Sequence, residues 1–178
     1  FKPRDTYRYR YYPMNVGSGT QPNYPAPGVL FDYYLPSDID TSMVLHIKNK
    51  SGEVIRSFIP NVLSKAEVTR RDMSTEELTY SVNASLKKSK GYHRFKWDMK
   101  QSGVWDKRPN AAFSNGPMVL PGEYSVVLEL DSTKIQQDFK LLPDPRVIGK
   151  VVSMQDLETQ EKLAKQIVDL YSSAKKMA

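Results

Sequence analysis

The chain has 178 residues, 12 prolines, no cysteine and a formal net charge of +6 from 26 basic and 20 acidic residues. This length suits one domain with appendages or two small domains, and such a chain can bury a core without disulfide bonds. The lack of cysteine excludes a thiolate nucleophile and a cysteine-ligated metal site, and the basic residues are scattered, which is typical of a solvated surface rather than a nucleic-acid-binding face.

Residues 1–27 are predicted to form an extended arm. The stretch "TYRYRYYPMNVGSGTQPNYPAPG" alternates aromatic and basic residues and then becomes rich in proline and glycine. Proline at this density is incompatible with a helix and favours extended or turning backbone. We expect Tyr7, Tyr9, Tyr11 and Tyr12 to dock this arm onto its own domain or onto a neighbouring one.

From residue 28 the apolar residues recur with a period of two, as in half-buried strands. Turns are predicted at "NKSG" (49–52), at Pro121-Gly122 and at "DSTK" (131–134). The expected strands are 29–35, 42–48, 53–59, 91–99, 123–130 and 135–142. Six strands with short turns predict a mainly β domain over 28–148, an antiparallel β-sandwich of the immunoglobulin or fibronectin type III class.

The strand "GYHRFKWDM" (91–99) contains a histidine, a tryptophan and an aspartate, and therefore resembles a site. Period-2 alternation places His93, Phe95, Trp97 and Met99 on one face and Tyr92, Arg94, Lys96 and Asp98 on the other. Trp97 and Asp98 then point away from each other. We expect Phe95 and Trp97 to lie in the core.

An insertion is expected at 60–90, with a short helix near 75–87. The pair Ser74 and Glu77 resembles a capping box, and Leu78, Val82 and Leu86 follow at helical spacing.

The last segment, 149–178, is expected to form one long helix. Ser153 can cap it, with acidic residues in the first turn and lysines near its end. An apolar stripe runs along it at Leu157, Leu163, Ala164, Ile167, Val168, Leu170 and Tyr171. About 24 residues make a helix of about 36 Å, too long to be hidden on one small domain. We expect it to pair with a following helix that lies outside this chain.

No motif in the sequence predicts catalysis, a cofactor or a metal. His46 is expected on a polar strand face and His93 at the end of the core, and neither has metal-ligand spacing around it. Motifs of the GxSxG, phosphate-loop and GxGxxG type are absent. No apolar run approaches the ~18 residues of a membrane span, and the first residues do not resemble a signal peptide.

The aromatic residues are the stronger binding candidates. Trp105 lies in a loop rich in turn residues, and with Tyr24 and Phe113 it could present rings to a carbohydrate. The alternative is that Trp105 and Phe113 fold back and plug the end of the sandwich. Exposure of Trp105 separates these two interpretations.

Several segments together resemble a known family. They are, in chain order, "FKPRDTYRYR", "GVLFDYYLP", "GEVIRSF", "GYHRFKWDMK", "PMVLPGEYSVVLEL" and "LPDPRV" followed by "DLETQEKLAKQIVDL". This order resembles the C-terminal region of bacterial sortilin-like (VPS10-type, BNR/Asp-box) β-propeller proteins, which are often described as glycosyl hydrolases. The segment 60–90 and the turn "DSTK" depart from that pattern.

The resemblance implies a fibronectin-like accessory domain that follows a β-propeller and braces or positions it, in a protein exported by a Gram-negative bacterium. The implied partner is that upstream propeller. No catalytic residue is implied within this chain, since the Asp-boxes belong to the propeller. A carbohydrate-binding module is the alternative function, and an enzyme with an unrecognised site is a third.

Overall fold

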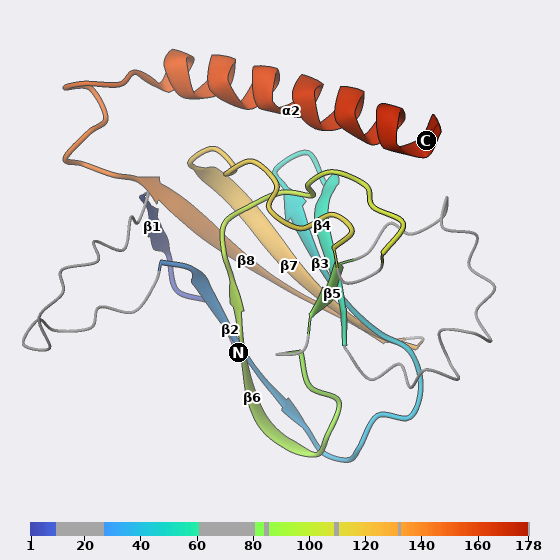
Figure 1. Ribbon diagram of the computed structural model, residues 1–178. Coiled ribbons are helices and arrows are strands. Elements are labelled where there is room, and N and C mark those ends of the chain that lie inside the picture. Colours follow the sequence, from blue (N-terminus) through green and yellow to red (C-terminus); the bar gives the residue numbers. More distant parts are fainter. Residues whose placement is uncertain (10–26, 61–80, 84–85, 109–110, 132, 178) are drawn as a thin grey trace, which may run out of the picture.

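The computed structural model of the chain describes residues 1–9, 27–60, 81–83, 86–108, 111–131 and 133–177. Its elements are β1 (Thr6–Arg8), β2 (Val29–Leu35), β3 (Met43–Asn49), β4 (Val54–Pro60), β5 (Ser81–Asn83), β6 (Gly91–Trp97), β7 (Gly122–Leu130), β8 (Thr133–Pro143) and α2 (Met154–Met177). All six strands expected from the period-2 pattern are present, as β2, β3, β4, β6, β7 and β8. The protein is mainly β, with one long C-terminal helix (Figure 1).

The larger sheet has the strand order β1-β8-β7-β3-β4-β5 and curls along its length (Figure 1). Its four central strands are antiparallel, but β1 pairs with β8 and β5 pairs with β4 in parallel. The prediction of a purely antiparallel arrangement is therefore wrong, and the sheet is mixed. Both parallel strands come from segments for which the sequence predicted other structures.

The first of these is the arm. Thr6–Arg8 pairs with Leu141, Leu142 and Pro143, so the start of the predicted arm belongs to the sheet as an edge strand. Asp5 supports this pairing, because its carboxylate accepts the backbone N–H of Lys140 at 2.9 Å. Residues 10–26 lie outside the described part of the chain.

The second is the predicted helix near 75–87. Ser81–Asn83 forms β5 and pairs with Phe58–Pro60, so a helix that continues through these residues is wrong. Helical spacing of three apolar residues is a weak signal over so short a segment, and a neighbouring strand edge can override it. Residues 61–80 and 84–85, including Leu78, lie outside the described residues.

The β3–β4 and β7–β8 hairpins confirm two of the three predicted turns, although β8 already begins at Thr133 and β7 at Gly122. The Asn49 side-chain carbonyl accepts the N–H groups of Ser51 and Glu53, while Gly52 adopts a φ of 84°. Leu130 pairs directly with Thr133, and Asp131 takes a φ of 50° in the turn between them. These are the residue types that tolerate left-handed backbone.

The second sheet is the antiparallel pair β2–β6, whose inner face packs on the larger sheet. Phe31 and Trp97 contact Phe139 of β8 with ring centroids 5.4 and 6.1 Å apart, and Phe58 of β4 contacts Phe95 at 4.9 Å. Both sheets contribute to one buried cluster that includes Val29, Phe31, Tyr33, Leu35, Met43, Leu45, Ile47, Phe58, Leu86, Phe95, Trp97, Met99, Val119, Tyr124, Val126, Phe139 and Leu141. The inner faces expected from period 2 are therefore confirmed.

Phe95, Trp97 and Met99 are completely buried, as the alternation predicts. The Trp97 indole N–H donates to the carbonyl of Lys100 at 2.8 Å, which satisfies its polar atom inside the core. Asp98 points away from Trp97 and accepts the N–H of Lys100 at 3.2 Å. This stretch is a core strand rather than a site.

Helix α2 confirms the predicted C-terminal helix and its cap. Ser153 Oγ accepts the N–H of Asp156 at 3.1 Å, while the Asp156 carboxylate accepts the N–H of Ser153 at 2.8 Å. This reciprocal pair is a capping box. Figure 1 shows α2 lying across one end of the sheets, over the loops that connect the strands.

Candidate interaction surfaces

Trp105 lies beneath α2. Its side chain is only 7% exposed, and its backbone N–H donates to Ser172 Oγ of the helix at 3.0 Å. The Lys176 ammonium lies 5.8 Å from the ring centroid, within the range of a cation–π contact. An enclosed ring cannot offer a face to a sugar. The position of Trp105 therefore counts against glycan binding at this residue and favours the plug.

Phe113 belongs to the same loop. It is half-buried with a φ of 58°, and it lines a depression of about 430 Å³ between the loop and α2 together with Trp105 and Val168. Tyr24, the third residue predicted to bind carbohydrate, lies outside the described residues. The three rings are thus not shown together.

Of the four tyrosines predicted to dock the arm, two are described. Tyr7 of β1 is 51% exposed, and Tyr9 is half-buried with the Arg146 guanidinium 5.8 Å from its ring centroid. Tyr11 and Tyr12 lie outside the described residues. Docking to another domain through these tyrosines stays a prediction.

A crevice of about 530 Å³ lies between the end of β8 and the start of α2. The polar side chains in it already serve the fold: Arg146 forms a two-pronged ion pair with Asp144, and Asp156 caps the helix. The hydrogen bonds from Arg146 lower the pKa of Asp144 to about 2. The carboxylates of Asp144 and Asp156 in the crevice are therefore already engaged by Arg146 and Ser153.

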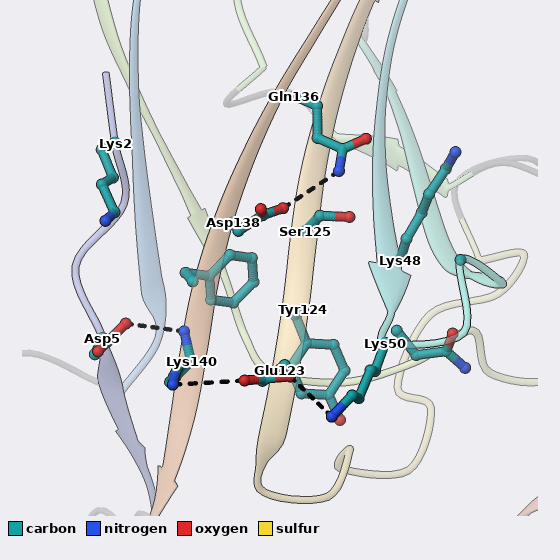
Figure 2. Close-up of a pocket in the computed structure, with 13 residues that line it drawn as sticks. Lys2, Asp5, Lys48, Lys50, Glu123, Tyr124, Ser125, Gln136, Asp138 and Lys140 are labelled. Atoms are coloured by element: carbon teal, nitrogen blue, oxygen red, sulfur yellow. Dashed lines mark hydrogen bonds and ion pairs between the residues drawn. The ribbon is translucent and has the colours of Figure 1, made fainter.

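A charged hollow of about 510 Å³ lies over β3, β7 and β8 (Figure 2). Glu123 is bridged by Lys50 at 3.1 Å and Lys140 at 3.5 Å, and these lysines lower its pKa. Asp138 accepts a hydrogen bond from the Gln136 amide at 3.2 Å. Glu123 and Lys140 are paired across β7 and β8, and such cross-strand ion pairs are ordinary on a solvated sheet face.

Two further features are absent from the described part of the chain. No group of three or more histidine, aspartate or glutamate side chains there could hold a metal ion. No helix in that part is both long enough and apolar enough to cross a membrane.

The inner side of α2 is held mainly by polar contacts. Asp106 is the centre of these contacts, since its carboxylate accepts Lys175 Nζ at 2.6 Å and forms two hydrogen bonds with the Arg108 guanidinium. Both partners hold the pKa of Asp106 well below its usual range. Gln101 adds a weak bond to Glu161 at 3.4 Å. The half-buried helix positions are Leu157, Glu161, Ala164, Val168, Ser172 and Lys175.

The apolar stripe predicted on this helix is split by the way it docks. Leu157, Ala164 and Val168 turn toward the domain, whereas the other apolar residues of the stripe turn away. The exposed fractions of Leu163, Ile167, Leu170 and Tyr171 are 54%, 65%, 72% and 55%. These four residues, spaced i, i+4, i+7 and i+8, form a continuous exposed face, which we call the outer helix face.

A second exposed surface was not identified from the sequence. Tyr34 of β2 and Tyr92 of β6 lie on the solvent side of the two-stranded sheet, 48% and 76% exposed. The same period-2 alternation that placed Trp97 inside places these residues outside. The missed signal was their cross-strand pairing, which depends on the register between two distant segments.

Comparison with protein-family models, with curated proteins and with solved structures found no match for this chain.

Proposed function

We propose that this chain is a non-catalytic accessory domain, an immunoglobulin- or fibronectin-like sandwich, that packs against another domain of a larger exported protein. The outer helix face carries this proposal. In line with the resemblance drawn from the sequence, the partner is a β-propeller that precedes this domain.

The energetics of α2 support a docking role. None of its 24 residues is buried, although four large apolar side chains share one side. A helix in water depends on tertiary packing of its apolar side for most of its stability. Contiguous exposed apolar patches on soluble proteins mark interaction sites. Tyr7, half-exposed on the edge strand β1, is a second candidate contact.

Footprinting of the natural protein that carries this sequence tests the proposal. Hydroxyl-radical labelling of Leu163, Ile167, Leu170 and Tyr171 should be lower in the natural protein than in the 178-residue chain. The double variant Ile167→Glu/Leu170→Glu should restore the labelling of Leu163 and Tyr171 and release the domain as a protease-resistant fragment. The control variant Gln166→Glu/Ser173→Glu adds the same charge beside the outer helix face and should change neither readout.

Two results would contradict the proposal. One is equal labelling of the outer helix face in the natural protein and in the chain. The other is a natural protein that contains no domain beyond this chain.

A further inference from the structure

The outer face of the β2–β6 sheet carries a cluster of exposed rings. Tyr34 and Tyr92 are directly paired across the two strands, with ring centroids 4.7 Å apart and planes tilted by 43°. Phe1 extends the cluster, with its ring 6.1 Å from that of Tyr92 and tilted by 32°. The exposed fractions of Phe1, Tyr34 and Tyr92 are 68%, 48% and 76%. We call these three rings the aromatic platform.

A charged pair adjoins the aromatic platform. Asp32 and Arg94 form the next cross-strand pair on the same face of the sheet, and two hydrogen bonds of 2.6 and 2.9 Å join their side chains. We call this two-pronged ion pair the Asp32–Arg94 fork. The hydrogen bond from Arg94 lowers the pKa of Asp32, so the carboxylate stays ionised. Phe1, Asp32, Tyr92, His93 and Arg94 line a shallow hollow of about 370 Å³. That volume lies at the small end of the range for ligand sites, about 300–1,000 Å³.

The fork retains hydrogen-bonding capacity for a ligand. A guanidinium carries five N–H donors, and the two bonds to Asp32 use only two of them. Each carboxylate oxygen likewise retains a lone pair. The side chains of Arg94 and Asp32 are 63% and 40% exposed, so these groups face solvent. Donors and acceptors in one plane beside a ring can bind neighbouring hydroxyl groups.

We propose that the outer face of β2–β6 is a binding site for a neutral oligosaccharide of β-linked hexoses. A β-linked glucose unit has equatorial substituents, so each face of the sugar presents weakly positive C–H groups. These complement the negative face of an aromatic ring, while the Asp32–Arg94 fork takes the hydroxyls at the sugar edge. The site lies on the β2–β6 sheet, apart from the outer helix face, and it can be tested on this chain alone.

Size argues against a protein partner. The aromatic platform and the fork occupy two strands of seven residues each, a strip roughly 23 Å long and two strands wide. A specific protein interface takes about 800 Å² from each partner, several times the area of such a strip. Charge argues against single-stranded nucleic acid, because the Asp32 carboxylate beside the rings repels phosphate and already neutralises Arg94.

Titration of the chain with cellotetraose, followed by NMR and calorimetry, tests this site. Saturable binding with shifts confined to β2 and β6 is expected. Tyr92→Ala and Tyr34→Ala should each weaken binding about tenfold or more, as expected for loss of a stacking ring. Ile135→Ala is the control, since Ile135 of β8 is 51% exposed and lies outside both proposed surfaces, and this variant should bind normally. Thermal unfolding of each variant checks that the fold persists.

Three outcomes would overturn the proposal. The first is no saturable binding of cellotetraose or of laminaritetraose. The second is unchanged affinity in folded Tyr92→Ala and Tyr34→Ala. The third is that oligo(dT) binds the same residues more tightly than either sugar, which would make the aromatic platform a base-stacking surface.

Discussion

Replacement of Trp97 by alanine should remove a large part of the stability of this domain. The side chain is completely buried, and its ring centroid lies 6.0 Å from that of Tyr124 and 6.1 Å from that of Phe139. A buried aromatic side chain removes ~150–250 Å² from water, which at ~25 cal/mol per Å² stabilises by about 4–6 kcal/mol. Measured costs of such truncations are about 3–5 kcal/mol, and they include a cavity term because the surrounding core relaxes only in part. The Lys100 carbonyl also loses its hydrogen bond, at about 1 kcal/mol.

We therefore expect Trp97→Ala to lower the free energy of unfolding by about 4 kcal/mol, out of a total of about 5–15 kcal/mol for a domain. With a urea slope of ~2 kcal/mol per M, the unfolding midpoint followed by circular dichroism should fall by about 2 M. Trp97→Phe keeps most of the packing and should cost less than half as much. Tyr92→Ala removes an exposed ring and should change stability by at most about 0.5 kcal/mol. A loss below 1 kcal/mol for Trp97→Ala would refute the assignment of Trp97 to the core and the strand register on which it depends.

Two further predictions concern the loop under α2. Gly103→Ala should destabilise the domain by about 1–3 kcal/mol, because a Cβ at this position would collide with the backbone of Ser114 in the facing loop segment. Gly122→Ala is the control, since a Cβ there would meet only the Tyr124 ring at 3.8 Å, and its free energy of unfolding in urea should be nearly unchanged. Asp106→Asn should increase amide hydrogen exchange in the last turns of α2, since it removes the partner of Lys175. The pKa of Asp106 is lowered in the folded protein, so the stabilisation of α2 by its carboxylate should be complete above pH ~4. This stabilisation should be lost as the pH falls below that point and through the pKa of Asp106 in the folded protein. Hydrogen-exchange protection of α2 that stays constant as the pH falls below ~4 would contradict this role.

Strand positions and inner faces were predictable because they depend on local alternation. Alternate residues are buried in β2 from Val29 to Leu35 and in β3 from Met43 to Ile47, as a period of two predicts. The capping box at Ser153 and Asp156 was equally local, since it needs only two residues three apart. These features require no knowledge of which strand lies beside which.

The candidate surfaces were less predictable because they depend on pairing between distant segments. The sequence favoured a buried plug for Trp105 but left an exposed ring open, and the burial came from contact with α2, 67 residues along the chain. Tyr34 and Tyr92 form a platform because β2 and β6 pair in one register. A shift of one residue would have placed them on opposite sides of the sheet.

The sequence by itself determined that the protein is mainly β, which residues of the main strands enter the core, and where the C-terminal helix begins. Tertiary structure decided that β1 and β5 join the sheet in parallel, and that α2 turns Ala164 and Val168 inward and Ile167 and Leu170 outward. The physical reason is the separation along the chain over which each interaction acts. Periodicity and capping act over a few residues, whereas sheet order and helix docking depend on contacts between segments far apart in the chain.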